Sequence, residues 1–290
     1  MASKLIPSNP EAVTVIRDVV PGVIVTSSAP FLRFGRIKIG GRGTIVRMQN
    51  GSLAVFSPTA LTDELKQKVD SMGEVKYITA LDYEHHIFLG PWYEKYPNAK
   101  VLGPEGLPEK RASQKNENVP FAVVFDAKKK DEIKVDPEVC CPYSLQALWT
   151  AADSQQFDAE FEYEYVHSHA NKEIVFNHKP TRTLIEADLL FNLPATEQHS
   201  KAGIDPSSGI LTKIFAALTH TRGEAVGQRR FLWYMASKTD RAAFNESMAR
   251  INAWDFERLI PCHGDVIEKD GKTTFQRVMK WHLDAALKKQ

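Results

Sequence analysis

The chain has 290 residues, and its 37 lysines and arginines nearly balance 36 aspartates and glutamates, for a formal net charge of +1. This balance gives no reason to expect nucleic acid or an anionic membrane as a partner. With 43% hydrophobic and 25% charged residues, the composition is that of a soluble globular protein long enough for a substantial core.

The cysteines and the apolar pattern indicate an intracellular protein. Cys140, Cys141 and Cys262 do not make a disulfide framework, because their number is odd and two are adjacent. A reducing compartment fits them better. The N-terminal residues lack an apolar core of signal-peptide length, and no apolar run approaches the roughly 18 residues that cross a bilayer. We therefore expect a cytoplasmic protein with no membrane partner.

The N-terminal part predicts antiparallel β structure followed by alternating helices and strands. Thr44–Met48 and Leu53–Phe56 flank an Asn-Gly pair, which is a strong hairpin signal. Apolar residues at helical spacing predict a helix over Ala60–Met72, ended by Gly73. The other expected elements are strands at Val13–Val20, Gly22–Thr26, Val75–Ala80, Lys100–Leu102 and Phe121–Phe125, and a short helix opening at Gly90-Pro91.

Between the first strands, Phe31–Ile39 alternates basic and apolar residues and then meets a run of glycines. The run Gly40-Gly41-Arg42-Gly43 lacks the lysine and the serine or threonine of a phosphate-binding loop. We expect it to be a flexible turn.

The C-terminal part predicts a second sheet and a helical segment. Its strands are expected at Ser144–Thr150, Glu160–Val166, Glu173–Phe176, Arg182–Ala187 and Arg258–Ile260. Helical apolar spacing is found at Ile210–Thr219, Arg229–Ala236, Asp240–Ala253 and Thr273–Leu287. We expect a single α/β domain over residues 1–290 with two sheets and a helical insertion at about 194–256.

Metal-capable side chains follow several of these strands. His85 and His86 come after the strand Val75–Ala80, and His169 precedes the strand Glu173–Phe176. Asp188 and His263 each follow a strand as well. Because strand ends meet at one edge of a sheet, these residues are expected to lie close together.

The same segments, in this order, resemble the metallo-β-lactamase superfamily. Ala80–His86 stands where that family carries its His-x-His-x-Asp-His motif. His169–Phe176 is similar to its third motif, Leu184–Phe191 to its bridging-aspartate motif and Ile260–Gly264 to its final histidine motif. The resemblance implies a four-layer αββα sandwich with one or two metals at the edge between the sheets.

The first motif departs from the family's pattern. Leu81 and Tyr83 stand at the two leading histidines, His85 stands at the aspartate, and His86 matches the last histidine. The resemblance therefore implies one divalent metal ion rather than two, zinc first, with iron or manganese as alternatives. The ligand set that it implies is His85, His86, His169, Asp188 and His263.

Two positions stay open in this register. In an extended loop, Asp82 and Glu84 alternate away from the site, although a shift of the loop would bring one of them in. His167 lies two residues before His169 and would point the same way, so either can be the ligand. A nucleophilic pair of Cys262 with its neighbour His263 is disfavoured, because adjacent residues on an extended segment point to opposite faces.

The resemblance implies a metal-dependent hydrolase that acts on an ester, lactone or amide-like bond of a small-molecule substrate. His85, as a ligand or a base, and Tyr83, as a hydrogen-bond donor to a bound anion, are the candidate catalytic residues. The alternative is a non-catalytic protein of the same fold with a binding or scaffold role. The aromatic residues of 194–256 are expected to form a partial lid over the site, which favours partly apolar substrates.

Overall fold

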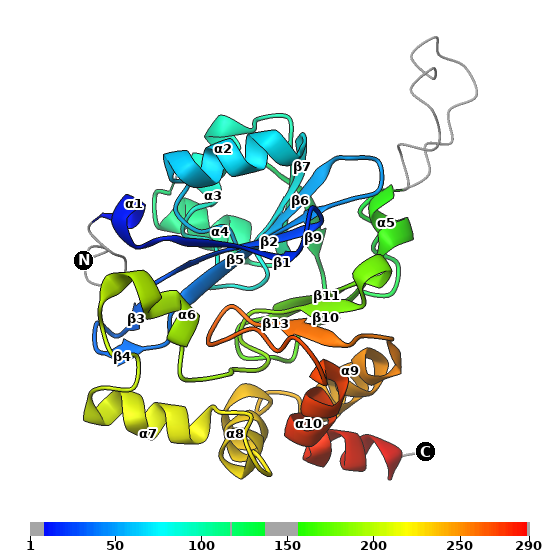
Figure 1. Ribbon diagram of the computed structural model, residues 1–290. Coiled ribbons are helices and arrows are strands. Elements are labelled where there is room, and N and C mark those ends of the chain that lie inside the picture. Colours follow the sequence, from blue (N-terminus) through cyan, green and yellow to red (C-terminus); the bar gives the residue numbers. More distant parts are fainter. Residues whose placement is uncertain (1–8, 117, 137–155, 289–290) are drawn as a thin grey trace.

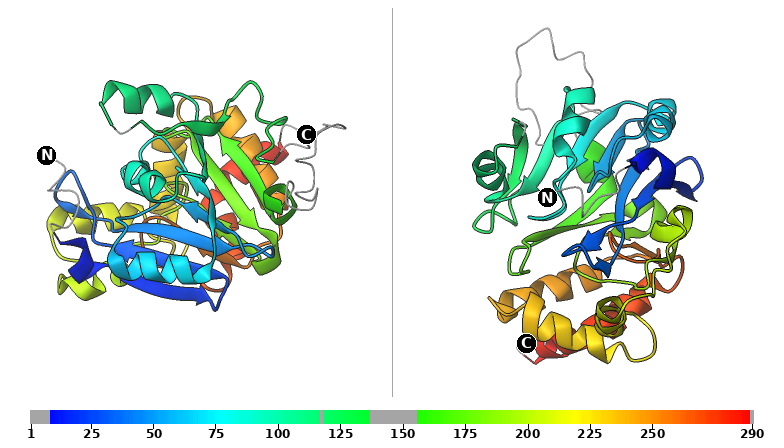
Figure 2. Two further views of the ribbon diagram at one scale, coloured as in Figure 1. Left: turned by 90° about the horizontal axis from the view of Figure 1, so that it is seen from above. Right: turned by 90° about the vertical axis from the view of Figure 1, so that its left-hand side faces the viewer.

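The computed structural model describes residues 9–116, 118–136 and 156–288. Two β-sheets face one another, and helices cover the outer side of each sheet (Figure 1). The right-hand view of Figure 2 shows the same layers, with the C-terminal helices below the sheets. This is the four-layer αββα sandwich predicted from the sequence. The predicted strand Ser144–Thr150 and the residues Cys140 and Cys141 lie outside the described residues.

In the described part of the chain, the larger sheet has seven strands in the order β1-β2-β5-β6-β7-β8-β9. The strands from β1 to β6 pair antiparallel, and those from β6 to β9 pair parallel. The strands are β1 Val15–Val20, β2 Ile24–Ala29, β5 Gly41–Arg47, β6 Leu53–Phe56, β7 Val75–Thr79, β8 Lys100–Pro104 and β9 Phe121–Phe125. The helices of this half are α1 Pro10–Val13, α2 Asp63–Met72, α3 Leu89–Lys95 and α4 Leu107–Ser113.

Among the residues that the structure describes, the smaller sheet has four strands in the order β10-β11-β12-β13, and only its last pair is parallel. The strands are β10 Phe161–Val166, β11 Glu173–His178, β12 Thr183–Ile185 and β13 Arg258–Ile260. The helices of this half are α5 Gln156–Glu160, α6 Thr196–His199, α7 Ile210–Leu218, α8 Val226–Phe231 with a π-helix at Leu232–Ala236, α9 Arg241–Ala253 and α10 Gly271–Leu287. Four of them, α6 to α9, come from the segment 194–256.

Local sequence explains several of these boundaries. The hydroxyl of Thr62 accepts a hydrogen bond from the backbone N–H of Leu65 and caps α2, which ends before Gly73 at a φ of 155°. The carboxylate of Asp240 caps α9 in the same way through the N–H of Ala243. These side chains satisfy N–H groups that the first turn of a helix leaves without partners.

Aromatic side chains fill the space between the two sheets. Phe56 of β6 and Phe176 of β11 have ring centroids 4.9 Å apart, and Phe157 stacks on Phe161 at 4.6 Å. All four are fully buried. Burying one such side chain stabilises a fold by about 1.5–3 kcal/mol. This core holds the facing sheets together and fixes the edge where their loops meet.

Two segments near the N-terminus add to or differ from the sequence prediction. Phe31–Ile39, for which no element was predicted, forms a small hairpin of β3 (Leu32–Arg33) and β4 (Ile37–Lys38), because Phe34 and Gly35 both adopt a positive φ. The expected flexible turn at residues 40–43 is wrong, since Gly41 begins β5 and Arg42 is buried within it. Among the described residues, no helix is both long and apolar enough to cross a membrane.

Candidate metal centre

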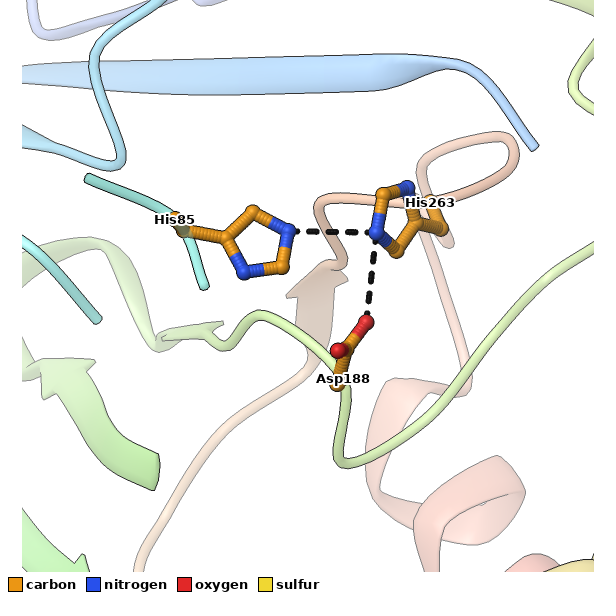
Figure 3. Close-up of side chains that lie close together, drawn as sticks. All are labelled: His85, Asp188 and His263. Carbon is orange, nitrogen blue, oxygen red and sulfur yellow. Dashed lines mark hydrogen bonds and ion pairs between the residues drawn. The ribbon is translucent and has the colours of Figure 1, made fainter. Parts of the chain in front are cut away.

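Three of the predicted ligands converge at the edge between the sheets (Figure 3). His85 lies in the loop after β7, Asp188 follows β12, and His263 follows β13. The Nε2 atoms of His85 and His263 are 3.1 Å apart, and His263 Nε2 is 3.2 Å from Asp188 Oδ1. All three ligand atoms lie within 4.8 Å of one another.

Hydrogen bonds on the far side of each residue fix which atoms face the centre. Nδ1 of His263 is 2.6 Å from the carbonyl oxygen of Gly40, so this nitrogen carries the proton and donates it. Nδ1 of His85 donates in the same way to Oδ1 of Asp82, at 2.8 Å. In neutral rings, both Nε2 atoms are therefore unprotonated and present lone pairs to the centre.

The carboxylate of Asp188 is held in a matching way. Its Oδ2 accepts a hydrogen bond of 2.5 Å from the side-chain amide of Asn171. Its Oδ1 is buried and has no hydrogen-bond donor among the described residues. With both rings neutral, three acceptor atoms thus face one another, which is unfavourable unless a proton or a metal ion lies between them.

The spacing fits a metal ion. Ligands at about 2.0–2.1 Å from a tetrahedral zinc lie roughly 3.4 Å from each other, close to the distances of 3.1 and 3.2 Å found here. A hydrogen bond from the outer nitrogen of a ligating histidine to a carboxylate or carbonyl is also the usual second-shell arrangement. The residues present therefore fit a divalent metal.

The electrostatics of the centre favour added positive charge. Burial alone would lower the pKa of His85, but the carboxylates of Asp82 and Asp188 raise it to about 9. Burial, together with Asp82 and Asp188, also raises the pKa of Glu173 well above its usual range. Burial and the neighbouring Glu173 do the same for Glu186. Four buried carboxyl groups thus surround one site, and a proton or a metal ion offsets their repulsion.

Asp82 builds the loop that carries His85. Its Oδ1 accepts the backbone N–H groups of Glu84 and His85, both at 2.7 Å, as well as Nδ1 of His85. Residues 82–85 therefore bend around this carboxylate instead of running extended. The expectation that Asp82 alternates away from the site is wrong, because the side chain is fully buried against His85.

Arg42 and Gln198 hold the loop that carries His263. Nη1 of Arg42 donates to the carbonyl oxygens of Pro261 and Gly264, at 2.7 and 2.6 Å. Gln198 donates to the carbonyl oxygen of Cys262 and accepts the N–H of Gly264. The sequence prediction missed both residues. The glycines around Arg42 are the signal that would have found them, since they allow the backbone to approach closely.

Two other predicted ligands, His86 and His169, lie outside the three-atom group. His86 accepts a hydrogen bond at Nδ1 from Arg111, at 3.3 Å. Burial and the charges of Lys110 and Arg111 lower the pKa of His86 to about 4. Nδ1 of His169 accepts the N–H of Asn171, and burial lowers its pKa.

The aromatic ring of Tyr83 lies under Nζ of Lys110, 4.4 Å from the ring centroid. Its backbone N–H donates to the carbonyl oxygen of Asn171. Leu81 is buried in the core between the sheets, as its apolar side chain requires. Neither residue is among those that line the cavity described next.

A cavity of about 510 Å³ opens onto the three-atom group. It is lined by Phe31, Arg33, Phe34, Gly41, Arg42, Ser57, Pro58, Thr59, Glu84, His85, His86, Ile87, Phe88, Lys110, Gln114, Asp188 and His263. No lining residue comes from the segment 194–256 within the described chain, so the predicted lid is wrong.

The apolar side chains of that segment have other positions. Phe215 and Phe231 pack against Phe191, whose ring stacks on His263 with centroids 5.2 Å apart. On α7 the outward face is apolar, and Ile210 is 78% exposed. The aromatic cover over the cavity comes instead from the β3–β4 hairpin and from the residues that precede α3.

The fold resembles that of solved metallo-β-lactamases and of a flavo di-iron protein. The chain shares the fold of a metallo-β-lactamase from Pontibacter korlensis, at a TM-score of 0.52 and 11% identity, over 96% of this chain and 100% of that one. The mono-zinc form of the metallo-β-lactamase FIM-1 from Pseudomonas aeruginosa matches at a TM-score of 0.52 and 11% identity, over 96% of this chain and 99% of that one. A mutant flavo di-iron protein from Thermotoga maritima matches at a TM-score of 0.52 and 11% identity, over 93% of this chain and 62% of that one.

The metallo-β-lactamase fold is therefore the class to which the structure assigns this protein. Residues 34–224 match the family described as a domain of unknown function, DUF4336, and the chain belongs to that family. A comparison with curated protein sequences gives no match.

Proposed function

We propose that this protein is a divergent metal-dependent hydrolase of the metallo-β-lactamase type, acting on an ester, lactone or amide-like bond of a small molecule. The observation that carries the proposal is the convergence of three acceptor atoms, from His85, Asp188 and His263, with their outer atoms already hydrogen-bonded. The proposal is also supported by the fold, which is similar to that of proteins named as metallo-β-lactamases, one of them in a mono-zinc form.

One divalent ion is proposed, held by His85, Asp188 and His263. Two imidazoles and one carboxylate suit zinc first, and iron or manganese as alternatives. Three protein ligands leave a position open, as catalytic zinc sites do. When bound, the metal would lower the pKa of a water molecule and polarise the substrate carbonyl.

Other residues of the chain orient the two ligand histidines and supply a neutral hydrogen-bond donor for the substrate. Asp82 fixes the ring of His85, and the carbonyl oxygen of Gly40 fixes the ring of His263. His86 lines the cavity and, with its pKa lowered to about 4, is neutral near pH 7. Because Arg111 donates to its Nδ1, the proton of this ring resides on Nε2. We propose that this N–H stabilises a substrate oxygen as negative charge develops.

The alternative is a non-catalytic protein that keeps the fold and binds a metal or a small molecule. The burial of Leu81 in the core favours it, because in the register that the resemblance implies this position would carry a metal ligand. Metal content and hydrolytic activity separate the two.

The test begins with elemental analysis and with reconstitution by zinc, iron and manganese separately. We expect a stoichiometry near one in the wild type and in His220→Ala, which removes a histidine outside the cavity, and near zero in His263→Ala. A panel of aryl esters and lactones then measures hydrolysis before and after chelation. Metal binding without any chelator-sensitive hydrolysis would favour the non-catalytic alternative, and no metal binding would overturn both the metal site and the hydrolase.

A further inference from the structure

The β3–β4 hairpin brings a cation to the wall of the cavity that opens onto the candidate metal centre. Phe31, Arg33 and Phe34 all line this cavity, and Phe34 at the hairpin tip is 77% exposed. The segment Phe31–Ile39 carries three basic residues and no acidic one. The proposed hydrolase function assigns no role to this basic hairpin.

The charges of the cavity do not cancel. Its lining contains three cationic side chains and two carboxylates, Glu84 and Asp188, which leaves +1 with neutral histidines. Lys110 forms an ion pair with Glu84 at 2.8 Å, and Arg42 forms one with Glu197 at 3.2 Å. A divalent metal beside Asp188 would add two further positive charges.

Arg33 is the cation of this lining that remains available to a ligand. Nζ of Lys110 already donates to the carbonyl oxygen of Tyr83 and to Glu84. Arg42 is buried, and its N–H groups already donate to four protein oxygens. Within the described residues, Arg33 has no carboxylate partner, and its guanidinium lies 5.3 Å from the ring centroid of Phe34.

Apolar side chains occupy much of the remaining lining. They come from Phe31, Phe34, Pro58, Ile87 and Phe88. A ligand that satisfies this lining has an apolar body and an anionic group. Guanidinium groups pair with carboxylates and phosphates in a planar, bidentate geometry that lysine cannot reproduce.

We propose that the substrate is a small apolar ester, lactone or amide that also carries a carboxylate or phosphate, and that Arg33 binds this anionic group. The inference rests on the proposed function and names the substrate class of the same cavity. Arg33 is then a specificity-determining residue, separate from the metal ligands.

The test uses two binding probes that share one carboxylate and an apolar ring. Both 4-phenylbutyrate and benzylsuccinate offer a carboxylate to the metal, but only benzylsuccinate has a second one for Arg33. A phosphonate analogue of benzylsuccinate compares phosphate with carboxylate at the second position. Calorimetric titration of the zinc-loaded protein measures each affinity.

We expect benzylsuccinate to bind about tenfold or more tightly than 4-phenylbutyrate, because a hydrogen bond to a charged group is worth at least that factor. Arg33→Gln should abolish this preference, and Arg33→Lys should restore part of it. Arg36→Gln is the matched control, since Arg36 lies on the same hairpin, is exposed and does not line the cavity. It should keep the preference.

The same titrations on metal-free protein separate this inference from the proposed function. Without a metal, each probe can place a carboxylate on Arg33, so both should bind, and Arg33→Gln should weaken both affinities while Arg36→Gln should not. A preference that survives Arg33→Gln in the zinc-loaded protein, or no preference in the zinc-loaded wild type, overturns the inference even if hydrolysis is found. If no hydrolysis is found but the preference for benzylsuccinate depends on Arg33, the proposed hydrolase function is wrong and the anion-binding role of Arg33 is retained.

Discussion

Adjacent histidines, His85 and His86, give the sharpest test of the metal centre. The structure places Nε2 of His85 3.1 Å from Nε2 of His263, whereas Nδ1 of His86 accepts a hydrogen bond from Arg111. The family motif, laid along the sequence, assigns a ligand role to both. Replacing each histidine by alanine therefore tests whether His85 alone binds the metal, as the structure indicates, or both histidines do, as the motif implies.

The size of the effect follows from the number of ligands. Four-ligand structural zinc sites bind with about 10–16 kcal/mol, so that one ligand contributes about 3 kcal/mol. Loss of that ligand corresponds to roughly 100-fold weaker binding. We expect this loss in His85→Ala. We expect His86→Ala to keep the wild-type affinity, because Arg111 retains its bond to the backbone carbonyl oxygen of residue 86.

The assay is competition for zinc with a chromogenic chelator, after circular dichroism has shown that both variants are folded. The two variants share one loop and one type of substitution, so each is the control for the other. Equal losses, or a larger loss in His86→Ala, would show that the bend around Asp82 does not present His85 to the metal.

Three further predictions concern the support of the site. Asp188→Ala should weaken zinc binding more than Asp82→Asn, for which a second-shell loss of about 10–100-fold is expected in the same chelator competition. The raised pKa of His85 means that its proton stabilises the metal-free fold fully below pH 6.5, and that this contribution is lost as the pH rises through about 9. Zinc affinity should therefore rise about tenfold per pH unit towards that value, in titrations that also detect one released proton. Gly40→Ala should lower the melting temperature and the zinc content, since an added Cβ would lie 2.2 Å from a buried glutamine oxygen at a φ of +68°. Gly22→Ala is its control, because its φ is +71° and no atom lies within 4 Å; equal effects of the two changes would exclude the clash as the cause.

The sequence predicted the parts of the fold that local patterns determine. The Asn-Gly pair gave the β5–β6 hairpin, and apolar runs gave the strands of both sheets. Asp188 and His263 could be placed for the same reason, since each comes shortly after a strand that apolar residues identify. The four-layer architecture was implied by the resemblance of the motifs to the metallo-β-lactamase superfamily, and the structure confirms it.

Contacts over long sequence distances were not predictable in this way. The bonds from Arg42 to Pro261 and from His263 to Gly40 join residues 219 and 223 positions apart. Alternation along the chain also failed to place Asp82, because hydrogen bonds to its own carboxylate bend the loop. The lid prediction failed because the aromatic residues of 194–256 have partners elsewhere, such as Phe191.

The cost of this centre argues against an inert remnant. A buried carboxylate oxygen that has no donor in the described part of the chain, as at Asp188, destabilises a fold, and so does the repulsion between Glu173 and Glu186 beside it. Apolar residues of similar volume would remove both costs. Instead, three separate segments supply Asp82, Gly40 and Asn171 to orient the ligand atoms. Such an arrangement is stabilising when a cation occupies the centre, and this is the physical reason for proposing a metal site there.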